Sequence, residues 1–153
     1  MNTVIENIKT VVERNILLNF LDQFNQIIYN IDMDVKSFII NNSQPQNHDS
    51  LFKYLGNDME SRNVESLLLK SKELEKELLV TDVITLTVAI PPTSELVSTV
   101  SDWLRETTGN SVFLDFKIEK DLIGGAVIET GERIKDYSVK EYFKKRKEHS
   151  NGL

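Results

Sequence analysis

Apolar side chains recur every three or four residues through the first half of the chain, the spacing of helices with one buried face. One series continues without a gap through Leu17, Leu21, Phe24, Ile28, Ile31, Val35 and Phe38. This seven-residue repeat predicts a long helix over 16–40 that packs against another helix. The register shifts near Glu13, where we expect a helix break or a local change of pitch.

A polar, turn-forming cluster at 41–47 ends this helix. An apolar segment at 51–55 predicts one or two helical turns closed by Gly56. A further helix is expected over 59–79, with an apolar face made of Val64, Leu67, Leu68, Ser71, Leu74 and Leu78. Two interpretations stay open: these helices form a self-contained hairpin or bundle, or they leave an apolar surface for the helices of another protein.

The second half mixes strand and helix patterns and holds five of the six glycines. Alternating β-branched residues predict strands over 82–90 and 112–118. Between them, Thr93 or Ser94 caps a helix that ends at Gly109. We expect its apolar set in the core: Leu96, Val97, Val100, Trp103 and Leu104.

A glycine pair, Gly124 and Gly125, interrupts the next strand-like run and predicts a bulge or sharp bend. Alternating segments on either side of Gly131 predict a β-hairpin. Ser138 should cap a last helix that runs to about 147, with Glu141 completing a capping box. Val139, Tyr142 and Phe143 are expected to face inward.

The predicted fold class is therefore α+β. A helical hairpin or bundle over 1–79 is followed by a small β-α-β-β-β-α domain over 80–153.

Charge is distributed unevenly along the chain. The net charge is −6, but residues 133–153 carry seven Lys and Arg against three acidic residues, a net of +4. Such an acidic protein is not expected to bind nucleic acid. The basic end is either a solvated helix terminus that suits the helix dipole or a docking patch for an acidic partner.

Groups that could carry chemistry are sparse. There is no cysteine, and the two histidines, His48 and His149, lack the spacing of metal ligands. The glycine pair is not part of a phosphate-binding loop, because the lysine and the strand–loop–helix context are missing. We expect a non-catalytic protein without cofactor or metal, and the apolar runs are too short to cross a membrane. The N-terminus lacks a basic segment, so no secretory signal is expected.

Four short motifs of the second half follow one another in order: Ala89-Ile90-Pro91, Gly109 before Val112-Phe113-Leu114, Asp121-Leu122-Ile123-Gly124-Gly125, and Gly131 to Ser138 with Asp136 between them. In this order and spacing they resemble the C-terminal half of the delta subunit of F-type ATP synthase, called the oligomycin-sensitivity-conferring protein in mitochondria. The proline that the family has after the aspartate of the third motif is replaced by Leu122 here. The family's N-terminal helical domain is also longer than the 79 residues available here.

The resemblance implies a non-catalytic stator subunit that links the catalytic head to the b stalk, at the cytoplasmic face of a bacterial plasma membrane. The implied partners are the N-terminal helices of the alpha subunits and the C-terminus of the b subunits, with the free subunit a monomer. The structural and stalk-binding motif would comprise Ile123, Gly124, Gly125, Gly131, Asp136 and Ser138. The head-binding helical face would comprise Leu17, Leu21, Phe24, Ile28 and Ile31.

Two other interpretations remain. The E subunit of V-type and archaeal-type ATPases also has a long N-terminal helix before an α/β domain, which a helix over 16–40 would fit, although Gly131, Asp136 and Ser138 favour the delta family. An unrelated helical adaptor is the other alternative, and its repeat over 17–38 would form a homodimer.

Overall fold

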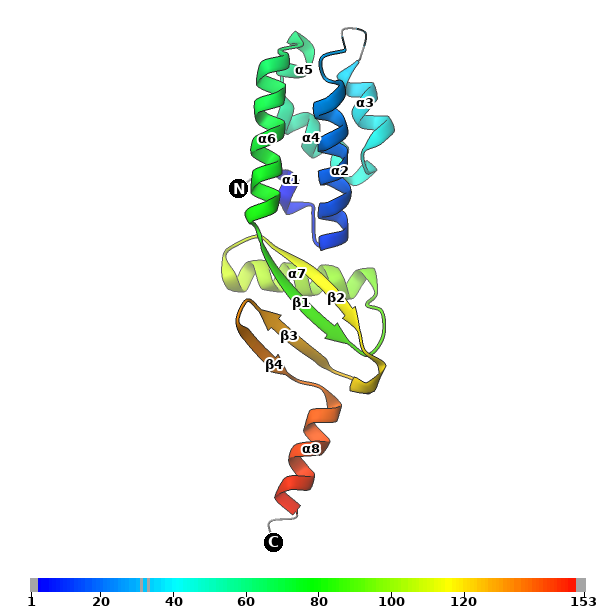
Figure 1. Cartoon of the computed structure of the whole chain (residues 1–153), viewed down its shortest axis with the longest axis vertical. Coiled ribbons are helices and arrows are strands. Elements are labelled where there is room, and N and C mark those ends of the chain that lie inside the picture. The colour runs from blue at the N-terminus through cyan, green and yellow to red at the C-terminus, as the bar shows by residue number, and fades with distance from the viewer. Residues whose placement is uncertain (1–2, 31, 33, 151–153) are drawn as a thin grey trace. The chain divides into compact units, whose positions relative to one another are not determined.

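The structure is a computed structural model that describes residues 3–30, 32 and 34–150, with side chains as far as 148. The chain divides into two compact units, Met1–Thr81 and Asp82–Leu153. The first is helical, and the second contains a four-stranded sheet with helices (Figure 1). This order of elements confirms the predicted α+β class.

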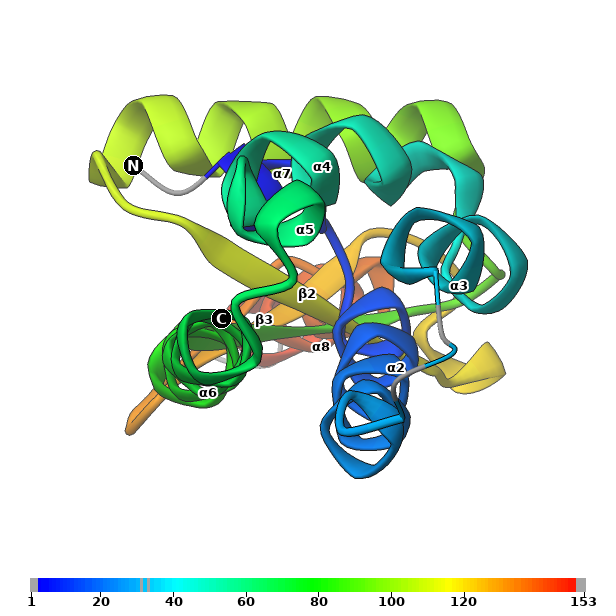
Figure 2. The ribbon, with the colours of Figure 1, turned by 90° about the horizontal axis from the view of Figure 1, so that it is seen from above.

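The first unit is built around two antiparallel helices, α2 and α6, which lie side by side in both ribbon views (Figures 1 and 2). Shorter helices complete the unit. The elements are α1 (Thr3–Glu6), α2 (Val11–Ile27), α3 (Val35–Asn42), η1 (Pro45–Asn47), α4 (His48–Leu55), α5 (Asp58–Ser61) and α6 (Val64–Val80).

The prediction of one long helix over 16–40 is wrong, because α2 ends at Ile27 and α3 begins at Val35. Asp34 starts the new helix by accepting a hydrogen bond from the backbone N–H of Ser37, at 3.2 Å. The repeat persists across the break because both helices turn their apolar sides to one core. Phe38 of α3 stacks on Phe20 of α2, with ring centroids 5.7 Å apart.

Two helix starts also differ from expectation. No break occurs near Glu13; α2 begins at Val11, and Glu13 forms a reciprocal capping box with Thr10. The helix expected over 59–79 is two helices, because Arg62 has a positive φ of 50° and Asn63 caps α6. The predicted buried face of α6 is confirmed for Leu67, Ser71, Leu74 and Leu78.

The sheet of the second unit has the strand order β2-β1-β3-β4. β1 pairs with β2 in parallel and with β3 in antiparallel fashion, and β3 and β4 form the expected hairpin. The elements are β1 (Asp82–Val88), α7 (Ser94–Thr108), β2 (Val112–Ile118), η2 (Lys120–Leu122), β3 (Ala126–Thr130), β4 (Arg133–Asp136) and α8 (Val139–Ser150).

Helix α7 covers one face of this sheet. Val97, Val100 and Leu104 pack on a core made of Ile84, Leu86, Val112 and Leu114. The expectation that Leu96 and Trp103 belong to the core is wrong, since their side chains are 47% and 57% exposed. Both lie at the edge of the helix face that Val97, Val100 and Leu104 turn to the sheet, where apolar side chains stay in contact with solvent.

Candidate functional site

The predicted motif residues gather where two connections of the second unit meet. One connection leads from β2 to β3 and contains the glycine pair; the other leads from β4 to α8. The N–H of Tyr137 donates to the carbonyl of Ala126 at 2.9 Å, and the N–H of Val139 donates to the carbonyl of Gly124 at 3.0 Å. These bonds join segments that are distant in sequence, and we call this region the glycine junction (residues 123–126 and 136–139).

The closeness of the two segments explains the glycine pair. Gly125 has a φ of +75°, and a Cβ atom there would lie 2.2 Å from the carbonyl oxygen of Tyr137. No real contact is that short, so only glycine fits without moving the backbone. At Gly124 a Cβ would lie 3.3 Å from a methyl group of Val139, which is tight but not prohibitive.

Asp136 and Ser138 organise the start of α8. Oδ1 of Asp136 accepts the N–H of Ser138 at 2.8 Å, and Oγ of Ser138 accepts the N–H of Glu141 at 3.1 Å. The predicted capping box is thus only half right, because Asp136 takes the N–H that Glu141 was expected to bind. The hydroxyl and N–H of Ser138, followed by Lys145 and Lys140, hold the pKa of Asp136 below its ordinary value.

Gly131 does not belong to this cluster. It lies in the turn between β3 and β4, at the opposite end of the hairpin, with a φ of +55°. A Cβ atom added there would meet no heavy atom of the described residues within 4 Å, apart from its own chain neighbours. The structure therefore brings together five of the six predicted motif residues: Ile123, Gly124, Gly125, Asp136 and Ser138.

Ile123 is the unusual member of the glycine junction. Its backbone has φ +67° and ψ −40°, a conformation that a β-branched residue rarely adopts. Its side chain is nevertheless 69% exposed, so the protein does not use it to fill a core. Strained backbone conformations concentrate at functional positions, and this makes Ile123 the first candidate for a contact residue.

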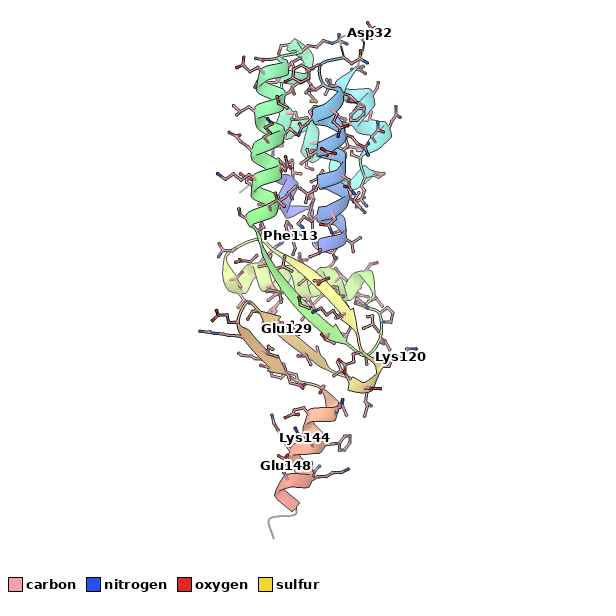
Figure 3. All side chains as sticks on the ribbon, in the orientation of Figure 1. Asp32, Phe113, Lys120, Glu129, Lys144 and Glu148 are labelled. Atoms are coloured by element: carbon pink, nitrogen blue, oxygen red, sulfur yellow. The ribbon has the colours of Figure 1, made fainter. Side chains whose placement is uncertain are left out.

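Two hollows meet at Ile123. One, of about 290 Å³, extends along the connection that follows β1 and is lined by Ile90, Pro91, Leu96 and the glycine pair, among others. The other, of about 560 Å³, is lined by Ile123 and by Lys140, Phe143, Lys144 and Lys147 of α8. Figure 3 labels Lys144 on α8 and Lys120 at the turn that precedes the glycine pair.

The outward position of α8 side chains corrects an expectation. Tyr142 and Phe143 were expected to face inward, but both are exposed and only Val139 is partly buried. Sequence reasoning missed this surface because it treated Phe143 as core. The signal lay in the spacing of Lys140, Phe143, Lys144 and Lys147, which places all four on one side of a helix.

The face predicted to bind the head lies in the helical unit. Leu17, Leu21, Phe24 and Ile28 are buried there, while Ile31 lies outside the described residues. Their burial fits the self-contained bundle, one of the two interpretations left open. Exposed apolar side chains occur elsewhere on the two long helices, at Val12, Ile16, Leu69, Leu79 and Val80.

Side chains that could carry out chemistry do not cluster in the described part of the chain. Nε2 of His48 lies 3.3 Å from the carbonyl oxygen of Ser43, and the side chain of His149 lies outside the described residues. Among the described residues, no three His, Asp or Glu side chains are grouped so that they could hold a metal ion. Over the same residues, no helix is both long and apolar enough to span a bilayer.

Comparisons with known proteins point to one family. Residues 50–149 match the family model "ATP synthase delta (OSCP) subunit". The chain is similar to ATP synthase subunit delta of Persephonella marina, with 28% identity over 141 residues that cover 78% of this chain and 76% of the relative. It is 34% identical over 65 residues to ATP synthase subunit delta of Rhodospirillum centenum, covering 42% of this chain and 35% of that one.

Among solved structures, a chain of the mitochondrial ATP synthase hexamer of Toxoplasma gondii aligns with 89% of this chain and 80% of its own length. The sequence identity is 14% and the TM-score 0.40.

Proposed function

The chain belongs to the ATP synthase delta (OSCP) subunit family and is a peripheral-stalk subunit of an F-type ATP synthase, and from this premise we propose how it is attached. It is a non-catalytic stator part whose two units, proposed as separate domains over 1–79 and 80–153, each bind a different partner. The helical unit binds the N-terminal helices of the alpha subunits. The α/β unit binds the C-terminal end of the b subunits. The complex lies at the cytoplasmic face of a bacterial plasma membrane.

The family match also decides between the alternatives that the sequence left open. A match over residues 50–149 includes the glycine junction and α8, and it favours neither an E-type stalk subunit nor an unrelated adaptor. Membership accounts for the motif order in the second half of the chain.

Head binding is proposed for the exposed apolar positions of α2 and α6 rather than for the buried series that begins at Leu17. Val12 and Ile16 on α2, with Leu69 on α6, are apolar side chains left in solvent on the two longest helices of the unit. Amphipathic helices bind such surfaces through anchors spaced by three or four residues. Leu17, Leu21, Phe24 and Ile28 support that surface from the core.

The glycine junction is the observation that supports the proposed binding to the stalk. Hydrogen bonds from Tyr137 and Val139 fix α8 to the end of the sheet, so that a partner held there is held by the whole unit. Two linked attachment sites hold the chain in the complex far better than either alone, because once one unit is bound the other meets its own partner at high effective concentration. A stator must resist torque, and bivalent attachment meets that need without any chemistry by this chain.

The test is purification of the tagged chain from gently solubilised membranes of its own cells, followed by mass spectrometry. We expect the alpha, beta and b subunits to come with it, and the purified free chain to be a monomer by light scattering. Recovery of V-type A and B subunits, or a stable homodimer with no ATP synthase subunits, would refute the proposal. The variant Ile16→Asp should lose alpha and beta but keep b, while Asn19→Asp, at an exposed site one turn further along α2, should keep all three.

A further inference from the structure

We propose that the surface formed by Ile123 and one side of α8 holds an acidic amphipathic helix, with an apolar stripe on Ile123 and Phe143 and carboxylates on the neighbouring lysines. The inference rests on the proposed function, since it assigns this helix to the C-terminal end of the b subunits. It adds the residues that make the contact and the chemistry that the partner must present.

The first argument is the segregation of charge on α8. Lys140, Phe143, Lys144 and Lys147 are spaced by three or four residues and line one hollow together with Ile123. The acidic residues Glu141 and Glu148 are not among the lining residues, and Glu141 pairs with Lys145 at 3.6 Å. The lysine side therefore carries a net positive charge, which complements an acidic partner.

The helix dipole does not account for this arrangement. Cations are favoured in the last turn of a helix, which suits Lys147 but not Lys144, near the middle of α8. Lys140, however, is the second residue of α8, at the positive end of the dipole, where a cation is unfavourable. Lys140 acts on Asp136 through charge, but that effect is smaller than the hydrogen bonds from Ser138.

The second argument is the apolar centre of the surface. Phe143 is 53% exposed and Ile123 69% exposed, and both line the same hollow between the three lysines. An exposed apolar pair inside a charged rim is the usual anatomy of a binding site. The backbone conformation of Ile123 is one that glycine would adopt more easily, which stability alone does not explain.

A helix fits this surface because its side chains recur at the same spacing as the lysines, every three or four residues. Lys140, Lys144 and Lys147 extend over about 10 Å of α8, at 1.5 Å per residue. A helix lying alongside presents carboxylates at the same intervals, with its apolar residues on the Ile123–Phe143 centre.

The test is calorimetric titration of the full chain with the extramembrane part of the b subunits from the same cells. Ile123→Gly removes the apolar anchor and relieves the strained backbone, so it should weaken binding at least about fivefold while leaving thermal stability equal or higher. Its control is Ile134→Ala on β4, which removes an equally exposed apolar side chain (68% exposed), and binding should not change.

Two charge reversals test the lysines that surround the apolar centre. Lys140→Glu with Lys144→Glu should weaken binding at least about tenfold at low salt and flatten its salt dependence. Arg133→Glu with Lys135→Glu on β4 changes the net charge by the same amount and should have a much smaller effect.

The outcomes separate the two proposals. If the unaltered chain binds the b subunits but each variant behaves like its control, the inference is overturned and the proposed function stands. If the unaltered chain does not bind the b subunits, both the inference and the proposed function are refuted. Binding of the chain to vesicles of anionic lipid, lost in the lysine variant while b binding is unchanged, would assign the surface to a membrane and also overturn the inference.

Discussion

Replacement of Gly125 by alanine tests whether the close approach at the glycine junction is required. The new Cβ would lie 2.2 Å from the carbonyl oxygen of Tyr137, whereas an ordinary carbon–oxygen contact needs about 3.3 Å. The segment that contains Tyr137 must therefore retreat by about 1 Å. A shift of that size disrupts the bonds of 2.9 and 3.0 Å that Tyr137 and Val139 donate across the junction.

The expected loss has two parts. A left-handed backbone costs an alanine about 1 kcal/mol relative to glycine. The two broken hydrogen bonds add about 0.5–1.5 kcal/mol each. Gly125→Ala should thus lower the free energy of unfolding by about 2–4 kcal/mol.

Gly131→Ala is the matched control, because Gly131 has a φ of +55° and its new Cβ would meet no atom of the described residues within 4 Å beyond its chain neighbours. Gly131→Ala should lower the free energy of unfolding only by the backbone contribution, about 1 kcal/mol. Urea unfolding followed by tryptophan fluorescence reports on the second unit, which contains both glycines, since Trp103 is the single tryptophan and lies on α7. If the two variants differ by less than about 0.5 kcal/mol, the close approach is not a constraint and the reasoning is wrong.

Three further predictions follow from particular contacts. Thr10→Ala removes the cap of α2 and should lower the free energy of unfolding by about 1 kcal/mol in thermal or urea unfolding; an unchanged midpoint would contradict the capping assignment. Phe24→Ala should lower the free energy of unfolding by about 3–5 kcal/mol, because Phe24 is buried, and should impair alpha binding only as far as it unfolds the helical unit. A variant with normal stability and no alpha binding would show instead that Phe24 is a contact residue. The hydrogen bonds from Ser138 hold the folded pKa of Asp136 below its ordinary value, so its stabilisation is complete above the unfolded pKa and is lost as pH falls through the folded pKa. Asp136→Asn should therefore flatten the acid limb of stability against pH, and an unaltered limb would refute this.

Local sequence signals predicted the second unit well because each of its elements carries its own boundary residue. Thr93 caps α7, Gly109 ends it in a left-handed conformation, and the hairpin turns at Gly131, all as expected. Such signals act within a few residues and need no knowledge of the rest of the fold.

The helical unit was predicted less well because periodicity does not distinguish one long helix from two that share a core. The series from Leu17 to Phe38 keeps its spacing across the break, since Phe20 and Phe24 of α2 both pack on Phe38 of α3. The cap at Asp34, which starts the second helix, was not predicted from the sequence. Tertiary packing imposed the pattern, and the pattern was then interpreted as local structure.

The motif residues were recognised by resemblance, but their roles came only from their contacts. Gly125 and Tyr137 are distant in sequence, and no local rule predicts that their backbones meet. The contact shows why the two motifs occur together, since a glycine in one is required by the backbone of the other.

The glycine junction also explains mechanically why the tightly constrained backbone lies beside the proposed contact surface. A load applied to Ile123 and α8 enters the chain on both sides of the junction, through the bonds that link Gly124 to Val139 and Ala126 to Tyr137. From there β3 passes it to β1, and β1 passes it to β2, through continuous ladders of backbone hydrogen bonds. A flexible tether would let α8 move before the sheet resisted. Direct backbone contact makes the sheet and the helix respond together, which is what a part that opposes torque requires.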